Sequence, residues 1–174
     1  MDLSSLDIET ERLHLRAYRE DDAAEIFAAV TPEICEYMTF NPAQSVEEVR
    51  LIGEKWLIQA AEGREVAVPI RDRATQRFLG MGGIHYRKHP QPGLGIWVRA
   101  DAQGRGYGRE AIVGLIGYVR DVLGEPEVHY VVAEENGPSR RIPESLGGVV
   151  FGSETVQRPS GPLYPGVIYR IALT

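Results

Sequence analysis

The sequence predicts a mixed α/β fold built on one sheet. Three observations predict it: strict polar–apolar alternation at residues 11–17, two strand-like runs joined by a polar turn in the middle of the chain, and strands alternating with helices in the second half. Hairpins combined with strand–helix alternation are typical of a mixed sheet. Because the 174 residues contain no linker and no internal repeat, we expect residues 1–174 to form a single domain.

The first half is expected to contain three strands and two helices. These are a strand at 11–17, helices at 23–30 and 45–63, and strands at 65–70 and 78–86. The charged segment 19–22 places acidic groups at the positive end of the first helix dipole. Ser45 and Glu48 have the spacing of a capping box, which predicts where the second helix starts.

The second half is expected to alternate strands with helices. The strands are expected at 94–98, 128–133, 149–156 and 167–172, the helices at 109–123 and 139–146, and a Pro/Gly-rich loop at 158–166. Gly124 and Gly147 should end the two helices, because glycine readily adopts the left-handed conformation found after a helix. The strand at 128–133 is nearly all apolar, which indicates burial on both faces.

The composition argues against several functional classes. With 43% hydrophobic residues, 25% charged residues and a net charge of −6, the chain is typical of a soluble globular protein and not of a nucleic-acid binder. No apolar run is long enough to span a membrane, and residues 1–5 lack the features of a signal peptide. The single cysteine, Cys35, allows no intrachain disulfide and no thiolate cluster, so we expect a cytoplasmic protein without a metal.

A glycine-rich segment at 103–108 separates the strand at 94–98 from the following helix. Glycines let backbone amides converge, and a helix N-terminus adds a positive dipole end, so the segment is suited to bind a pyrophosphate. The Rossmann fingerprint fails because Arg109 stands where a glycine is needed, and the Walker pattern fails because no Lys-Ser/Thr pair follows. When residues 103–108 are considered alone, a glycine-rich turn that binds no ligand is the alternative to a pyrophosphate site.

The spacing that is present, with Gln103, Gly106 and Gly108, is similar to the coenzyme A loop of the GNAT superfamily of acyl-CoA N-acyltransferases. Three further segments resemble that superfamily: 94–98 its Gly-Tyr-Trp strand, 136–147 its Asn-x-x-Ser and Leu-Gly element, and 9–16 the opening strand of ribosomal-protein N-terminal acetyltransferases. The resemblance implies the GNAT fold, which is a central, mostly antiparallel sheet with a splayed parallel strand pair and helices on both faces.

The resemblance also implies acetyl-CoA as co-substrate, bound where the strands 94–98 and 128–133 splay apart. The residues expected to contact it are Ile96, Trp97 and Val98 along the pantetheine arm, Gln103, Gly104, Arg105, Gly106, Tyr107 and Gly108 at the pyrophosphate, and Asn136 and Ser139 toward the sulfur.

The implied reaction is the transfer of an acetyl group to a primary amine by direct attack in a ternary complex. The acceptor would be a protein N-terminus or a small-molecule or peptide amine. The backbone N–H of Val98 is the expected donor to the oxyanion. Ser139 has two compatible roles, because a serine can hydrogen-bond the leaving thiolate and can also cap the helix at 139–146.

The general base is left open by the sequence. Relatives often carry acidic residues where this chain has Gly93 and the pair at 165–166. The candidates here are Glu135, and also Glu134, Glu154 and His85. Water is a further alternative for taking the proton.

Two functions therefore remain. One is the acetyltransferase, with acetyl-CoA and an amine as partners, no nucleic acid, no membrane, and a monomeric or homodimeric state. The other is a non-catalytic acyl-CoA-binding module that has lost its acid and base groups. Tyr164, in the loop at 158–166, is expected to line an acceptor pocket in the first case.

Overall fold

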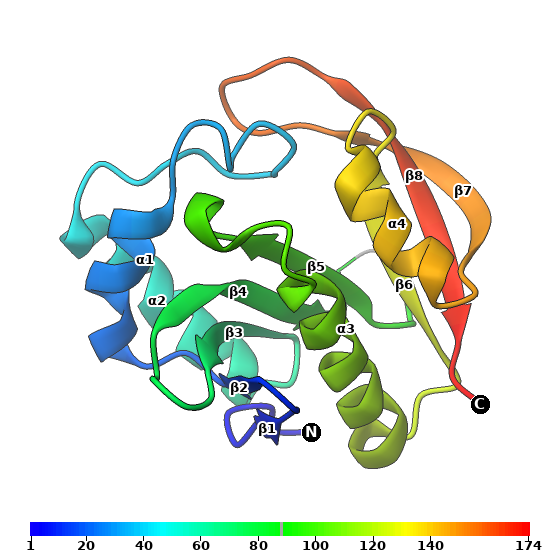
Figure 1. Ribbon diagram of the computed structural model, residues 1–174, viewed down its shortest axis with the longest axis horizontal. Helices are drawn as coiled ribbons and strands as arrows, with labels where there is room; N and C mark the ends of the chain where they lie inside the picture. Colours follow the sequence, from blue (N-terminus) through cyan, green and yellow to red (C-terminus); the bar gives the residue numbers. More distant parts are fainter. Residues whose placement is uncertain (88) are drawn as a thin grey trace.

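The computed structural model describes residues 1–87 and 89–174. Its strands and helices are, in chain order, β1 (Asp7–Glu9), β2 (Leu13–Arg16), α1 (Ala23–Ala29), α2 (Val46–Ala61), β3 (Glu65–Asp72), β4 (Phe78–His85), β5 (Gly93–Val98), α3 (Tyr107–Tyr118), β6 (Glu127–Ala133), α4 (Gly137–Ser145), β7 (Val149–Val156) and β8 (Tyr164–Ala172). Short helical turns at Glu20–Asp22, Ala100–Ala102 and Val119–Leu123 accompany them. Figure 1 shows the strands side by side with helices packed against them.

The strands of the described residues form one eight-stranded sheet in the order β1-β2-β3-β4-β5-β6-β8-β7. Within it β5 and β6 run parallel, and the other neighbouring pairs are antiparallel. In the described part of the chain, β5 and β6 are paired only through Gly93 with His129 and Leu94 with Tyr130, so the two strands diverge beyond Leu94. The predicted fold class, a mostly antiparallel sheet with one splayed parallel pair, is confirmed.

The two faces of the sheet carry separate apolar clusters, because successive residues of a strand point to opposite faces. On one face α3 and α4 pack on the sheet, and the cluster there includes Val66 and Leu94. On the other face α1 and α2 cover β3 and β4, and the cluster includes Ala67 and Trp97. The expectation of helices on both faces is confirmed.

The strands differ most from the expectation at the two ends of the chain. The alternating segment 11–17 forms the shorter β2, and a further strand, β1, pairs with it, with Ile8 opposite Leu15. A three-residue strand is too short to show an alternation pattern. β8 begins at Tyr164, which is paired with Val156 of β7, so the hairpin is longer and its loop shorter than predicted.

The helix starts follow local capping. The hydroxyl of Ser45 accepts from the N–H of Glu48 at 3.1 Å, as the predicted capping box requires, while the carboxylate of Glu48 accepts from the N–H of Gln44. At α4 the N-cap is Asn136, whose Oδ1 accepts from the N–H of Ser139 at 3.4 Å. The expectation that Ser139 caps this helix is therefore wrong, and its hydroxyl makes another contact.

Candidate active site

The glycine-rich segment 103–108 leads from β5 into α3. Gly104 and Gly106 have φ angles of 75° and 80°, in the left-handed region that favours glycine. Gly106 is the N-cap of α3, and because no side chain caps this helix, the N–H groups of its first turn are available to an anion. Nε2 of Gln103 donates to the carbonyl of Val98 at 2.9 Å, which fastens the segment to the end of β5.

Arg12 anchors the same segment from the loop before β2. Its Nη1 donates to the carbonyl of Arg105 at 2.9 Å, and its guanidinium lies 4.6 Å from the centre of the Tyr107 ring. Glu110 accepts from Nε of Arg12 and from the hydroxyl of Thr10, both at 2.6 Å. Burial opposes the ionisation of Glu110, but these hydrogen bonds outweigh it and lower the pKa of the carboxyl. The charged pair thus holds the loop in one shape.

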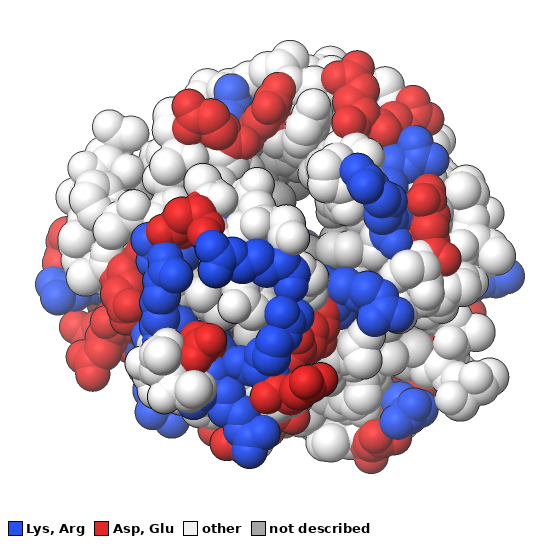
Figure 2. All heavy atoms as spheres, in the orientation of Figure 1, with Lys and Arg blue, Asp and Glu red and all other residues white. Residues whose placement is uncertain are grey.

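The face around this loop is positively charged. Figure 2 shows Lys and Arg side chains gathered over the start of α3 and the β3–β4 turn. Arg73 donates to the carbonyl of Thr10 at 3.2 Å, and Arg77 and Arg99 contact Asp101 at 2.7 and 2.6 Å. On a chain with a net charge of −6, such a basic face favours the approach of an anion.

The divergence of β5 and β6 leaves backbone groups of β5 facing the gap between the two strands. The N–H of Arg99 donates to the carbonyl of Leu79 at 2.9 Å, which fixes the phase of the β4–β5 ladder. Because hydrogen-bonded pairs alternate along an antiparallel ladder, the peptide groups of Trp97 face β4. Those of Ile96 and Val98 therefore face the gap.

Two hydroxyl groups meet beside this gap. The hydroxyl oxygens of Tyr130 and Ser139 are 2.8 Å apart, and Tyr130 is paired with Leu94 where β6 begins to diverge from β5. Tyr130 is 2% exposed, and burial raises its pKa to about 12, although the hydrogen bond between Tyr130 and Ser139 acts in the opposite direction. It is therefore a neutral hydroxyl near pH 7. Sequence reasoning missed Tyr130, and the available signal was a tyrosine inside an otherwise nearly apolar strand.

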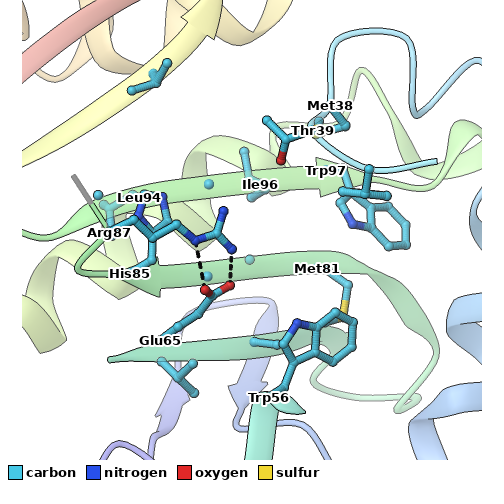
Figure 3. Close-up of a pocket in the computed structure, with 18 of the residues that line it drawn as sticks. Met38, Thr39, Trp56, Glu65, Met81, His85, Arg87, Leu94, Ile96 and Trp97 are labelled. Atoms are coloured by element: carbon cyan, nitrogen blue, oxygen red, sulfur yellow. Dashed lines mark hydrogen bonds and ion pairs between the residues drawn. The ribbon is translucent and has the colours of Figure 1, made fainter. Parts of the chain in front are cut away.

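A cavity of about 530 Å³ lies on the opposite face of the sheet, under α1, α2 and the segment that connects them. Residues of five strands, β3 to β7, complete its lining. Figure 3 shows side chains of α2, of the segment between α1 and α2, and of β3, β4 and β5 around it. The volume falls in the range of small-molecule sites, which is roughly 300–1,000 Å³.

The sheet residues that line the cavity form three rows across neighbouring strands. In order these rows are Glu65, His85, Gly93 and His129; then Ala67, Gly83 and Gly95; then Met81 and Trp97. Successive rows are two residues apart along each strand, which is about 7 Å. The first row is polar, the second is small, and the third is large and apolar, so the register of the sheet gives the cavity two unlike ends.

The imidazole of His85 covers Gly93. A Cβ atom on Gly93 would lie 2.3 Å from Cε1 of His85, so the ring occupies the space of a side chain at position 93. Burial, helped by the charge of Arg87, lowers the pKa of His85 against the opposing charges of Glu65 and Glu154. Glu65 is engaged by Arg87, whose Nε donates to Oε2 at 2.9 Å (Figure 3). The His85 ring is therefore neutral near pH 7 and can accept a proton.

A second histidine lies in the same polar row. His129 is 3% exposed, and burial, reinforced by His89, lowers its pKa. Neither ring nitrogen makes a hydrogen bond within the described residues, and Nε2 lies 3.5 Å from Oε1 of Glu127. A buried polar group of this kind gains free energy when a ligand or a water supplies the missing hydrogen bond.

Several residues singled out in the sequence lie elsewhere. Glu135 is exposed in the turn between β6 and α4 and is not among the residues described as lining the cavity. Tyr164 is also outside that set, but its ring is 5.0 Å from that of Tyr37, which does line the cavity. Cys35 is buried, and burial raises the pKa of its thiol.

Residues 1–87 and 89–174 contain neither a candidate metal cluster nor a membrane-spanning helix. No group of three or more His, Cys, Asp or Glu side chains there is arranged to hold a metal ion. In that part of the chain, no helix combines the length and the apolar character needed to cross a membrane.

Comparison with known proteins agrees with this geometry. The family model described as an acetyltransferase (GNAT) domain matches residues 12–149. The uncharacterized N-acetyltransferase YoaA of Bacillus subtilis is 27% identical over 171 residues, covering 94% of this chain and 95% of that protein.

Solved structures share the fold over nearly the whole chain. RimJ of Mycobacterium smegmatis in complex with CoA-disulfide has a TM-score of 0.85 at 18% identity and covers 99% of this chain and 90% of that one. A putative ribosomal-protein-serine acetyltransferase from Vibrio cholerae has a TM-score of 0.83 at 22% identity, covering 99% of both chains. Spermidine N-acetyltransferase from Vibrio cholerae, in complex with CoA and spermine, has a TM-score of 0.79 at 20% identity, covering 94% and 97%. With the family model spanning most of the sequence, this chain belongs to the GNAT family of acetyltransferases.

Proposed function

We propose that the protein is an N-acetyltransferase that transfers the acetyl group of acetyl-CoA to a primary amine, with residues 1–174 acting as one domain. One observation carries the proposal: the same stretch of β5 borders an anion-binding loop and a strand gap on one side and a cavity of small-molecule size on the other. Donor and acceptor would meet there from opposite faces, as direct attack in a ternary complex requires.

Acetyl-CoA would bind on the face that carries α3 and α4. The amides of segment 103–108 and the first turn of α3 would hold the pyrophosphate. The peptide groups of Ile96 and Val98, which face the gap, would pair with the pantetheine arm as an added strand would. The backbone N–H of Val98, as predicted, or that of Ile96, two residues earlier, would donate to the oxyanion. Two structural neighbours that carry coenzyme A or its disulfide support this choice of ligand.

The ammonium group of the acceptor must lose a proton before it can attack. His85 would accept that proton, because it lines the cavity, is neutral near pH 7 and covers Gly93, two residues from the open position at Gly95. Glu135 is less well placed, since it is exposed beyond the cavity lining. The amine nitrogen would then form a bond to the acetyl carbon, the carbon–sulfur bond would break, and the proton that the nitrogen loses in becoming an amide would leave the sulfur as the neutral thiol.

The departing sulfur carries negative charge and needs a hydrogen-bond donor. Ser139 would donate its hydroxyl hydrogen to the sulfur, and Tyr130 would donate in turn to Ser139, to which it is already hydrogen-bonded. The N–H of Ser139 is held by the Asn136 cap, which fixes the start of α4 beside the gap.

Release of the coenzyme A thiol from acetyl-CoA, measured with a panel of amines and peptides, tests the reaction. Turnover that depends on the acceptor is expected. Coenzyme A that binds in calorimetry but is not released from acetyl-CoA with any acceptor would instead favour the non-catalytic acyl-CoA-binding module.

A matched pair of variants tests the cofactor loop. The variants are Gly106→Asp and Gly106→Asn. The side chains of Asp and Asn have similar shapes, and both residues tolerate the left-handed backbone conformation of position 106 better than most others. The two variants therefore differ mainly in charge. Gly106→Asp should abolish measurable coenzyme A binding by placing a carboxylate against the pyrophosphate, while Gly106→Asn should retain most of it. Equal affinities in the two variants would place the pyrophosphate elsewhere.

A further inference from the structure

The cavity has two chemically different ends, which restricts what can fill it. At the polar end, His85 lies beside Glu65, which is paired with Arg87, and His129 lies in the same row on β6. The buried ring of His129 makes no hydrogen bond within the described residues, and Glu127 approaches its Nε2 only to 3.5 Å. A ligand at this end should therefore present a polar, hydrogen-bonding group.

Between the two ends the floor of the cavity is bare. Its middle row consists of Ala67, Gly83 and Gly95, and a Cβ atom on Gly95 would meet no heavy atom within 4 Å. Gly95 lies on β5 between Gly93, covered by His85, and Trp97. The open position over Gly95 is thus within reach of both the imidazole and the backbone groups of the strand gap.

The apolar end is built of large side chains held in place by ring contacts. Trp97 packs edge-to-face on Phe78 with ring centres 5.9 Å apart, and Trp56 does the same on Tyr18 at 5.2 Å. Met81 lies between the two tryptophans in Figure 3. Rings fixed by such contacts make a preformed apolar wall, which binds an apolar group at little cost in side-chain entropy.

The charges of the lining argue against a polyamine. Among the described lining residues, Glu65 already neutralises Arg87, and those contributed by α1 and α2 carry no carboxylate. A second or third ammonium group would have to lie against the apolar wall, where a buried charge without a partner is strongly unfavourable. A single ammonium group on the polar side of this wall avoids that cost, whereas a polyamine does not.

We propose that the acceptor is a primary monoamine joined by a short linker to a bulky apolar or aromatic group, with its nitrogen over Gly95 and its apolar group against Trp97 and Trp56. Gly95 and Trp97 are two residues apart on one strand, about 7 Å, which sets the linker at roughly two to four bonds. The inference rests on the proposed function and names the substrate class of that same site. A free arylalkylamine and a peptide with a bulky apolar first residue both have this chemistry.

Competing amines tested with acetyl-CoA decide between the classes. 2-Phenylethylamine should be used with a kcat/KM about 100-fold above that of ethylamine, because removing the apolar group forfeits the contacts at the wall. Spermidine should be used no better than ethylamine. A peptide beginning with Phe, compared with one beginning with Ser, distinguishes a peptide acceptor from a free amine: a preference for Phe that matches the phenylethylamine value indicates peptides.

Variants test where the apolar group binds. Trp56→Ala should lower the preference for phenylethylamine over ethylamine by about 10-fold or more, because the ring forms part of the wall. Leu57→Ala, at the neighbouring exposed residue of α2, removes an apolar side chain outside the described lining and should leave the preference unchanged. Gly95→Val fills the floor from a position where the added Cβ atom meets no heavy atom within 4 Å, so it should keep coenzyme A binding while reducing turnover of every amine.

The outcomes separate this inference from the proposed function. If spermidine or the Ser peptide is the preferred acceptor, the N-acetyltransferase stands and the acceptor class is wrong. An unaltered preference in Trp56→Ala, or full activity in Gly95→Val, likewise overturns the placement of the acceptor. If coenzyme A does not bind and no amine is acetylated, the proposed function itself fails.

Discussion

The hydroxyl oxygens of Tyr130 and Ser139 lie 2.8 Å apart beside the gap between β5 and β6. Ser139 can occupy this position because Asn136 takes over the capping of α4. A serine whose hydroxyl accepts from a neutral tyrosine keeps its own hydrogen for a third group, and a chain of hydrogen bonds strengthens each member. The pair is therefore suited to stabilise a thiolate that forms in the gap.

Ser139→Ala should lower kcat by about 100-fold, because the departing sulfur loses its hydrogen-bond donor. Tyr130→Phe removes one neutral hydrogen bond, about 1 kcal/mol, and should lower kcat only about fivefold. Steady-state kinetics and calorimetric titration with coenzyme A check both values, and the affinity for coenzyme A should change little. Ser153→Ala, at an exposed position of β7, is the control. An unchanged kcat in Ser139→Ala would contradict the assignment.

The pH dependence of kcat/KM reports on His85. Burial and Arg87 lower its pKa in the folded protein, so the base is ready above that pKa and lost as the pH falls through it. The acidic limb of the profile should therefore lie below the ~6.5 of an ordinary histidine. His85→Gln should remove this limb and lower the rate at pH 7 by about 100-fold.

His129→Gln is the informative comparison, because that imidazole lies in the same row of the cavity. It should retain the acidic limb even if acceptor binding weakens. A limb that disappears in His129→Gln and persists in His85→Gln would transfer the role of base to His129.

Arg12 should act on coenzyme A binding and not on chemistry. Its guanidinium bonds the carbonyl of Arg105 and is held by Glu110, and it lies on the loop side of the sheet. Arg12→Ala removes a charged hydrogen bond worth about 2 kcal/mol, so the Kd for coenzyme A should rise about 10-fold or more while kcat stays close to its original value.

Arg12→Lys separates positioning from charge. Lysine keeps the positive charge but lacks the planar fork that spans two acceptors, so its Kd should resemble that of Arg12→Ala. Arg50→Ala, at an exposed arginine of α2 beside Glu47, should leave the Kd unchanged. If Arg12→Lys binds coenzyme A with the original affinity, the positive charge of Arg12 and not its hydrogen-bonding geometry determines coenzyme A binding.

The parts of the site that lie within one segment could be predicted from sequence, and those that depend on strand register could not. The glycines at 104 and 106 could be read as a loop because the left-handed backbone there is a local demand. His85 meets Gly93 only because β4 and β5 are paired in one register, and a slip by one residue would turn the ring to the other face. The contact between Tyr130 and Ser139 also depends on tertiary structure, because it forms only when α4 is placed against β6.

The wall of the cavity formed by α1 depends on a buried ion-pair network centred on Asp22. Its carboxylate is fully buried and accepts from Arg16 at 2.7 and 2.8 Å and from Arg71 at 2.7 Å. These bonds tie the start of α1 to β2 and β3. Asp22→Asn should lower the free energy of unfolding by about 3 kcal/mol, because it leaves buried guanidinium charge uncompensated. Glu25→Gln is the control: Glu25 also contacts Arg71, but its side chain is 48% exposed, so its loss should cost less than about 1 kcal/mol.

The same network predicts how stability depends on pH. Burial alone would raise the pKa of Asp22, but the hydrogen bonds from Arg16 and Arg71 outweigh it and lower the pKa below its value in the unfolded chain. The carboxylate therefore contributes its full stabilisation above about pH 4, near the pKa of an unfolded aspartate, and loses it as the pH falls through the lower, folded pKa. Denaturant unfolding between pH 7 and pH 2 should show a weaker loss of stability on acidification in Asp22→Asn than in the original protein. Parallel curves for the two proteins would mean that Asp22 does not govern acid unfolding.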